Sequence, residues 1–127
     1  MRTFKTRWFA RFSRREDIAD AALREAIERA DRGLIDADLG GGLVKLRVAR
    51  PGEGRSGGYR VIVAYRDKDR AIFVFGFAKS QLANIAPEDL RSAREIADEL
   101  LKLSQKQLDE AVHADRILEI HNDQAKA

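Results

Sequence analysis

Apolar residues recur every three or four positions in two stretches of the chain, which is the spacing of one buried helix face. Residues 17–33 form the first stretch, and Gly33 at its end is a natural helix stop. The second stretch starts at Pro87, a residue favoured in the first turn of a helix, and continues to about Leu101. We therefore predict two amphipathic helices. Their apolar positions are Leu23, Ala26, Ile27, Ala30 and Leu34 in the first, and Leu90, Ala93, Ile96, Ala97, Leu100 and Leu101 in the second.

Between these helices lie three runs rich in Val, Ile, Phe and Tyr, a composition typical of β-strands. They cover Leu43–Ala49, Tyr59–Arg66 and Ala71–Ala78. The last two runs are separated by residues 67–69, a short polar turn that suits an antiparallel hairpin. The first two are joined by a glycine-rich loop. The three runs predict an antiparallel meander.

The two ends of the chain carry shorter signals. A strand over Thr3–Thr6 followed by a helical turn fits the aromatic residues near the N-terminus. Ser104 with a glutamine three positions later fits a capping box, which predicts a short helix to about Ala114. Residues 117–120 fit either a last strand or a segment that docks on the body. The whole pattern predicts an α+β fold, in which a small antiparallel sheet carries N-terminal helices on one face and is followed by a C-terminal helical extension.

Composition narrows the class of protein. The length of 127 residues fits one domain. The sequence has no cysteine, which excludes disulfides, thiolate metal sites and a cysteine nucleophile. It has no apolar run of signal-peptide type at the N-terminus, and none that approaches the roughly 20 residues of a membrane span. We therefore expect a cytoplasmic protein.

The net charge of +3 is unevenly distributed along the chain. Residues 1–80 hold 18 Lys and Arg against 11 Asp and Glu, a balance of +7, whereas residues 81–127 hold 6 against 10, a balance of −4. A basic body with an acidic tail favours a polyanionic partner such as nucleic acid. The alternative is a basic composition without a local purpose.

Positive charge is densest in KLRVARPGEGRSGGYR, residues 45–60, where five cations and one acidic residue accompany four glycines. Alternate residues of a strand point to the same face, so Lys45 and Arg47 point away from the apolar residues that flank them. Arg60 begins the next strand, and Lys79 follows the third. We expect these four cations to meet on the sheet face that the helices leave open.

Alternation is less regular on the second and third predicted strands. On the second strand, Ile62 falls on the face of Arg60. On the third strand, three phenylalanines fall on the face of Lys79. Either a β-bulge or a partly apolar groove would accommodate this pattern.

A group of cations on an open face suits the cleavage of a phosphodiester. Arginine donates hydrogen bonds in a planar fork that matches phosphate oxygens, and it stabilises the extra charge of a pentavalent transition state. A lysine among other cations has its pKa lowered toward neutrality and can act as base or acid. RNA brings its own nucleophile, the 2′-hydroxyl, so no serine or cysteine is needed. The basic half of the chain has no histidine, and its acids lie mostly in helix or turn patterns, so we expect neither a metal nor another cofactor.

These motifs resemble a known family. The run K-x-R-V-A-x-x-G-x-G-x-x-G-G-x-R, the following VIVAY, and FVFGFAKSQLANI before the last long helix resemble the RelE/ParE superfamily of bacterial toxins, specifically its RelE/HigB-like branch. The resemblance covers roughly residues 3–103. We therefore predict a RelE-like toxin domain over residues 1–103 and a C-terminal extension, which is not a separate domain, over residues 104–127.

The resemblance implies the toxin of a type II toxin-antitoxin system. Such toxins are mRNA interferases: they enter the ribosomal A site, cut mRNA there and so inhibit translation. The 2′-hydroxyl attacks the adjacent phosphate and leaves a 2′,3′-cyclic phosphate. An antitoxin, usually one with a helix-turn-helix domain, holds the toxin inactive.

Seven side chains are candidates for the site, six of them assigned by the resemblance and Tyr59 in addition to it. The catalytic candidates are Lys45 as base, Arg47 and Arg60 as transition-state stabilisers, and Lys79 as a further phosphate contact. The candidate RNA contacts are Arg50, Arg55 and Tyr59.

Two positions depart from the family pattern. The best-studied RelE toxins carry a catalytic arginine directly after the lysine that matches Lys79, and a catalytic tyrosine six residues beyond that arginine. Ser80 and Ala86 occupy those positions here. The general acid is therefore unassigned, and Tyr59 and Tyr65 are only weak substitutes.

Two other functions are compatible with the sequence. A ParE-type inhibitor of DNA gyrase needs no nuclease residues, which fits Ser80 and Ala86 but leaves Lys45, Arg47 and Arg60 unexplained. A non-toxic RNA-binding protein would use the cations without cutting. Assays of gyrase supercoiling and of growth inhibition would separate these alternatives from the nuclease.

Overall fold

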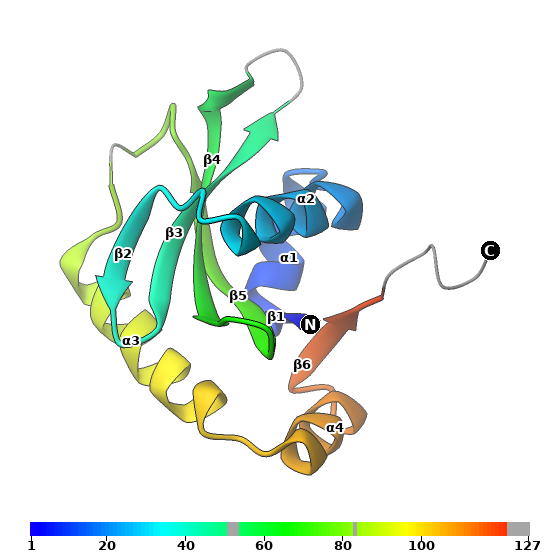
Figure 1. Ribbon diagram of the computed structural model, residues 1–127. Coiled ribbons are helices and arrows are strands. Elements are labelled where there is room, and N and C mark those ends of the chain that lie inside the picture. Colours follow the sequence, from blue (N-terminus) through cyan, green and yellow to red (C-terminus); the bar gives the residue numbers. More distant parts are fainter. Residues whose placement is uncertain (51–53, 83, 122–127) are drawn as a thin grey trace.

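The computed structural model describes residues 1–50, 54–82 and 84–121, and it describes residues 54–56 by their backbone only. Within these ranges the chain forms six strands and four helices (Figure 1). None of the helices in the described ranges is long and apolar enough to cross a membrane. The strands are β1 (Arg2–Thr6), β2 (Ala37–Gly40), β3 (Leu43–Arg50), β4 (Gly54–Arg66), β5 (Arg70–Ala78) and β6 (Ile117–Ile120), and the helices are α1 (Arg7–Arg15), α2 (Asp20–Asp31), α3 (Pro87–Leu101) and α4 (Gln105–His113).

The strands form one sheet in the order β2-β3-β4-β5-β1-β6. The predicted meander β3-β4-β5 is confirmed and is extended by β2, which pairs with β3 and was not predicted. β1 pairs with β5 in parallel, so the sheet is mixed, and the prediction of a wholly antiparallel sheet needs this correction. Parallel neighbours need a long crossover, and here two helices and three strands lie between β1 and β5 in the chain.

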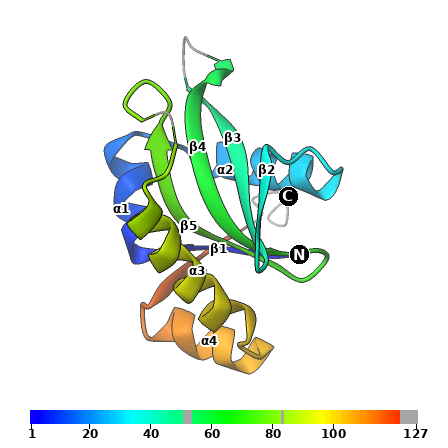
Figure 2. The ribbon, with the colours of Figure 1, turned by 90° about the vertical axis from the view of Figure 1, so that its left-hand side faces the viewer.

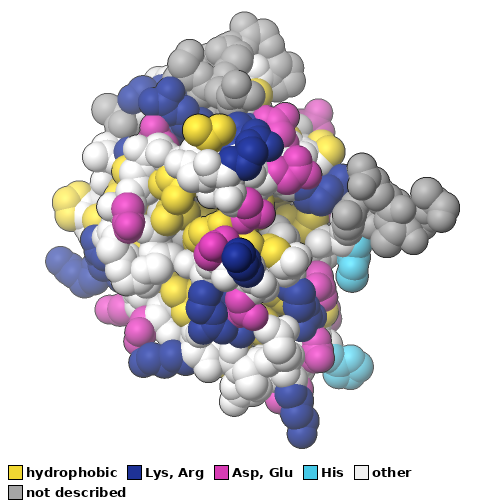
Figure 3. Space-filling model, in the orientation of Figure 1, with side chains coloured by type: hydrophobic (Ala, Val, Ile, Leu, Met, Phe, Trp, Pro, Cys, Tyr) yellow, Lys and Arg dark blue, Asp and Glu magenta, His cyan; other side chains and the backbone are white. Residues whose placement is uncertain are grey.

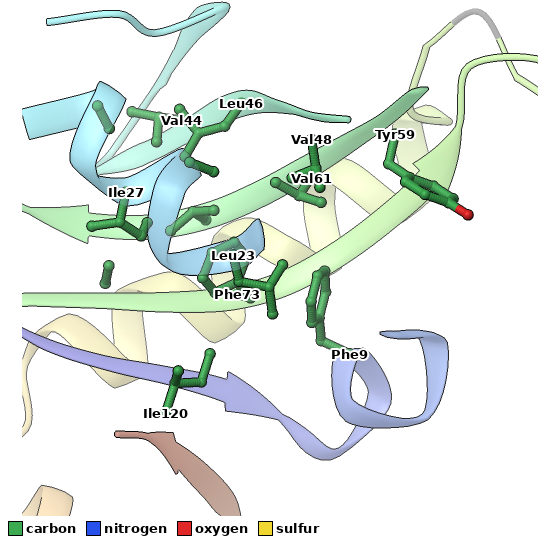
Figure 4. Packing of buried hydrophobic residues seen from close by; sticks show 14 of the residues in the cluster. Phe9, Leu23, Ile27, Val44, Leu46, Val48, Tyr59, Val61, Phe73 and Ile120 are labelled. Atoms are coloured by element: carbon green, nitrogen blue, oxygen red, sulfur yellow. The ribbon is translucent and has the colours of Figure 1, made fainter. Parts of the chain in front are cut away.

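Helices lie on both faces of the sheet. α1 and α2 pack on one face around a core that includes Phe9 and Leu23 (Figure 4). α3 and α4 pack on the other face, where Ile72 and Leu108 are buried. The predicted α+β class is confirmed, with the N-terminal helices on one face and the C-terminal helices as additional cover on the second.

α3 covers only part of its sheet face. α3 packs against β3, β4 and β5, and the core on this face includes Leu43 and Ala64. In Figure 2, no helix stands in front of the end of β3 and the start of β4. Arg47 lies in the second half of β3, and Arg60 of β4 pairs with it.

A β-bulge explains the irregular alternation of the third predicted strand. The register between β4 and β5 shifts by one residue after Ile62, which leaves Val74 outside the ladder. Phe73 therefore lies in the core under α1 and α2, whereas Phe77 lies opposite Arg60 on the other face. The bulge, one of the two predicted alternatives, is confirmed.

The C-terminal elements α4 and β6 dock on the body. The capping box predicted at Ser104 is present, and α4 buries Leu108 in the core. β6 pairs with β1, so the predicted last strand is confirmed. Arg2 of β1 binds Glu119 through Nε at 3.0 Å and Nη2 at 2.9 Å, and its Nη2 lies 2.8 Å from an oxygen of Asp109. One arginine thus links β1 to both C-terminal elements.

Gly76 of β5 leaves no room for a side chain, because α1 packs directly against it. A Cβ atom there would lie 2.7 Å from Phe12 Cε2 and 3.1 Å from Phe9 Cε1. We expect Gly76→Ala to lower the free energy of unfolding, measured in urea, by about 1–3 kcal/mol, the usual cost of overpacking a core. Phe12→Leu in the same chain should recover part of the loss. An equal loss from Gly76→Ala in both backgrounds would contradict the clash.

Candidate active site

Strand pairing brings three of the four catalytic candidates onto one face. Lys45 and Arg47 flank the buried Leu46 on β3 and point to the opposite side. In the β3–β4 ladder, Arg47 lies directly opposite Arg60, and Lys45 lies opposite Ile62. Like charges directly opposite each other in a ladder are destabilising, so this pairing requires a compensating negative charge.

Asp36, which directly precedes β2, supplies that charge. Its Oδ1 accepts a hydrogen bond from Arg47 Nε at 2.7 Å. Its Oδ2 lies 3.6 Å from Lys45 Nζ and 3.8 Å from Arg60 Nε. The cation group, by which we mean Lys45, Arg47 and Arg60, is thus arranged around one carboxylate.

The members of the cation group differ in exposure. The side chain of Arg47 is 48% exposed, that of Lys45 17%, and that of Arg60 only 6%. Arg47 is therefore the most accessible to an incoming phosphate, and Arg60 lies deepest.

Burial and charge together shift two pKa values in this site. Burial lowers the pKa of Arg60, and the nearby charge of Arg47 lowers it further, against the opposing effect of Asp36. Partial burial alone would raise the pKa of Asp36, but the hydrogen bond from Arg47 and the charges of the cation group outweigh it and hold that pKa below its usual range. Asp36 is therefore ionised at neutral pH, and its negative charge faces the side chains of Lys45, Arg47 and Arg60.

Backbone contacts hold this site in place. The N–H of Asp36 donates to the carbonyl oxygen of Lys45 at 2.9 Å, which fixes the carboxylate beside β3. From α2, Arg29 Nη2 donates to the carbonyl oxygen of Arg47. The hollow beside the cation group is lined by Arg29, Leu34, Ile35, Asp36 and Arg47.

The surface charge around the fold is mixed. Figure 3 shows Lys and Arg side chains interspersed with Asp and Glu on the face seen in Figure 1, rather than one continuous basic patch. What distinguishes the cation group is therefore its convergence on one carboxylate rather than the number of cations in the chain.

Lys79 follows the last residue of β5. Its backbone N–H donates to the carbonyl oxygen of Gly58 at 2.9 Å, which continues the β4–β5 ladder beyond Ala78. Its side chain is exposed, two residues beyond Phe77, the partner of Arg60 in the ladder. A role beside the cation group stays a prediction for Lys79.

The sequence of this chain matches a known protein family over most of its length. Residues 1–120 match the family described as "RelE toxin of RelE / RelB toxin-antitoxin system". The chain belongs to the RelE toxin family. A comparison with curated protein sequences gives no match. The family match continues through α4 and β6, and it makes the chain a toxin of a toxin-antitoxin system, with an antitoxin as its partner.

Two candidate RNA contacts of this RelE toxin, Arg50 and Tyr59, lie together on the α1 and α2 side of the sheet. Tyr59 is 2% exposed and belongs to the core on the α1 and α2 face (Figure 4). Phe12 meets its ring edge-on. Its hydroxyl donates to the backbone oxygen of Glu16 at 3.3 Å. The guanidinium of Arg50 lies over the same ring, 5.6 Å from its centre, and the side chain of Arg55 lies outside the described residues. A buried ring offers no surface for stacking a base, so we do not retain Tyr59 as an RNA contact.

The weak substitutes for a general acid also lie on the wrong face. The hydroxyl of Tyr65 donates to Asp31 of α2, and burial, together with that carboxylate, raises the pKa of Tyr65. Both tyrosines therefore point toward the N-terminal helices rather than the cation group. Ser80 lies in the turn after β5, and Ala86 is the N-cap residue of α3. No tyrosine takes the place of the family's missing acid.

Asp36 is the site residue that the sequence analysis missed. The available signal was the glycine turn at residues 40–42, where all three glycines have positive φ. A hairpin at that turn places the residues before it beside the strand that contains Lys45. The register of β2 and β3 then brings an acid at position 36 to the cation group.

Proposed function

We propose that this RelE toxin is an endoribonuclease that cleaves mRNA on the ribosome. The observation that supports this most directly is the convergence of Lys45, Arg47 and Arg60 within 3.8 Å of a single carboxylate, with the side chain of Arg47 48% exposed. A site that gathers basic side chains suits a phosphodiester, and two arginines suit its transition state.

Each cation has a distinct part in the proposed reaction. Arg47, the most exposed, donates to the nonbridging oxygens of the scissile phosphate. Arg60 stabilises the same charge from beneath. Lys45, whose Nζ lies 3.6 Å from Asp36 Oδ2, accepts the proton of the 2′-hydroxyl when its amine is in the neutral form. Lys79 adds an outer contact to phosphate.

The bonds and protons of this reaction balance without a cofactor. The 2′ oxygen forms a bond to phosphorus, and the bond from phosphorus to the 5′ oxygen breaks. The products are a 2′,3′-cyclic phosphate and a 5′-hydroxyl. Lys45 holds the proton that leaves the nucleophile, and the departing 5′ oxygen takes its proton from solvent.

The partners in this proposal are the ribosome, mRNA and an antitoxin of the helix-turn-helix type. The ribosome would present one phosphodiester in a fixed geometry, and this positioning contributes much of the rate in such reactions. The antitoxin would block access to the cation group or to the ribosome.

The test is cleavage of a defined mRNA on purified ribosomes. We expect the toxin to cut mRNA in the A site, with 2′,3′-cyclic phosphate and 5′-hydroxyl ends, and to cut the same RNA far more slowly without ribosomes. Primer extension and end-group analysis measure both. If the mRNA stays intact and the toxin inhibits supercoiling by DNA gyrase, the proposal is wrong and the toxin has a ParE-type activity. Intact mRNA with no inhibition of growth would indicate a non-toxic RNA-binding protein.

A further inference from the structure

We infer that Asp36 is a positioning residue of the active site, which holds Arg47, Lys45 and Arg60 at the geometry that cleavage requires. This inference rests on the proposed ribonuclease function. Asp36 lies at the centre of the cation group, and none of the roles that the family resemblance suggests is assigned to it.

The need for such a residue follows from the strand register. Arg47 and Arg60 are directly opposite each other in the β3–β4 ladder, and Lys45 is two residues from Arg47 on the same face. Three cations so placed repel one another, and long side chains respond by turning apart into solvent. A catalytic group that must hold one phosphate needs the opposite, a fixed and convergent arrangement.

The two oxygens of Asp36 divide their contacts in a way that produces this arrangement. Oδ1 takes the short hydrogen bond from Arg47 Nε, at 2.7 Å, while Oδ2 faces Lys45 Nζ and Arg60 Nε at 3.6 and 3.8 Å. A guanidinium has five donors in a rigid plane, so a bond to Nε sets the direction of the whole fork and leaves the Nη groups for phosphate. Asp36 thereby orients Arg47 without occupying its phosphate-binding edge.

Asp36 is itself well fixed. Its side chain is 13% exposed, and its backbone N–H is bonded to the carbonyl oxygen of Lys45. The carbonyl oxygen of Arg47 accepts from Arg29, so the backbone on both sides of the carboxylate contact is held. Because one negative charge meets three positive ones, the site keeps its attraction for phosphate.

Asp36→Asn separates positioning from binding, because it keeps the shape of the side chain and removes its charge. Binding is measured to a ribosome–mRNA complex whose cleaved nucleotide carries a 2′-deoxy sugar, which removes the nucleophile. We expect the variant to bind this complex as tightly as the wild type or more tightly, since the site gains a positive charge. We expect its single-turnover cleavage of the normal mRNA to fall roughly 100-fold, the scale of a small misplacement of reacting groups.

Two further variants complete the test. Asp98→Asn is the matched control, because Asp98 is an exposed acid on α3 that pairs with Lys102, the C-cap residue of that helix. This variant should bind and cut like the wild type. Asp36→Glu restores a carboxylate and should recover part of the rate, and it carries the test if Asp36→Asn does not fold.

The outcomes distinguish the inference from the function on which it rests. A rate for Asp36→Asn equal to or above that of the wild type would overturn the inference, because Asp36 would then be a spectator or a competitor of phosphate. Parallel losses of binding and thermal stability would also overturn it, in favour of a structural role. If the wild type and Asp98→Asn both fail to cut, the proposed function fails, and the positioning role fails with it.

Discussion

Replacing Arg47 by glutamine is expected to slow mRNA cleavage by roughly 10²–10³-fold, the usual effect of removing one preorganised donor from a developing oxyanion. Arg47 is the most exposed member of the cation group, and its Nε is already bound to Asp36. Its remaining donors are therefore directed and available, whereas an uncharged amide can neither span a phosphate nor balance its charge. Single-turnover cleavage on programmed ribosomes measures the effect.

Exposure makes this variant a clean test of chemistry rather than of folding. The side chain of Arg47 is 48% exposed, so its loss should change thermal stability little. Arg66→Gln is the matched control, because the side chain of Arg66 is 49% exposed and also bonds an aspartate, Asp69, but lies at the β4–β5 turn. We expect this control to cut at the wild-type rate. Equal rates for Arg47→Gln and the wild type would remove Arg47 from the site.

The sequence predicted the cation group because strand alternation is a local property. Lys45 and Arg47 are separated by one apolar residue, and Arg60 starts a strand that pairs with theirs, so their common face followed from spacing alone. The same rule should have excluded Tyr59 from the site. Because Tyr59 precedes Arg60 directly, the two must point to opposite faces, and the structure places the tyrosine in the core.

What the sequence did not predict depends on contacts between distant segments. β2 is only four residues long and has no clear apolar alternation, so the strand itself has no local pattern and the glycine turn that follows it is the only local signal for Asp36. The parallel pairing of β1 with β5 joins residues that are about 70 positions apart, which no local rule specifies. The position of the bulge in β5 depends likewise on how Phe73 fits beneath α1.

Replacing Arg70 by methionine is expected to lower the free energy of unfolding by about 3–5 kcal/mol, the usual loss when one partner of a buried ionic contact is removed. The side chain of Arg70 is 2% exposed. Its Nη1 donates to the carbonyl oxygens of Leu100 and Leu103 at 3.0 and 2.6 Å, and its Nε donates to Asp69 at 2.6 Å. Methionine can fill the space but cannot donate to the carbonyls at the end of α3, which would stay buried and unsatisfied.

Arg66→Met shows whether burial is the reason for this effect. Arg66 bonds the same Asp69 oxygen at 2.6 Å and the carbonyl oxygen of Leu101 at 2.8 Å, so its contacts are of the same kind. Its side chain is half exposed, and water can replace what methionine removes, so we expect a loss of only about 0–1 kcal/mol. Urea denaturation of both variants measures the difference. Similar losses for Arg70→Met and Arg66→Met would mean that Arg70 stabilises the protein through its hydrogen bonds alone. The burial of its side chain would then add nothing to the attachment of α3 to the sheet.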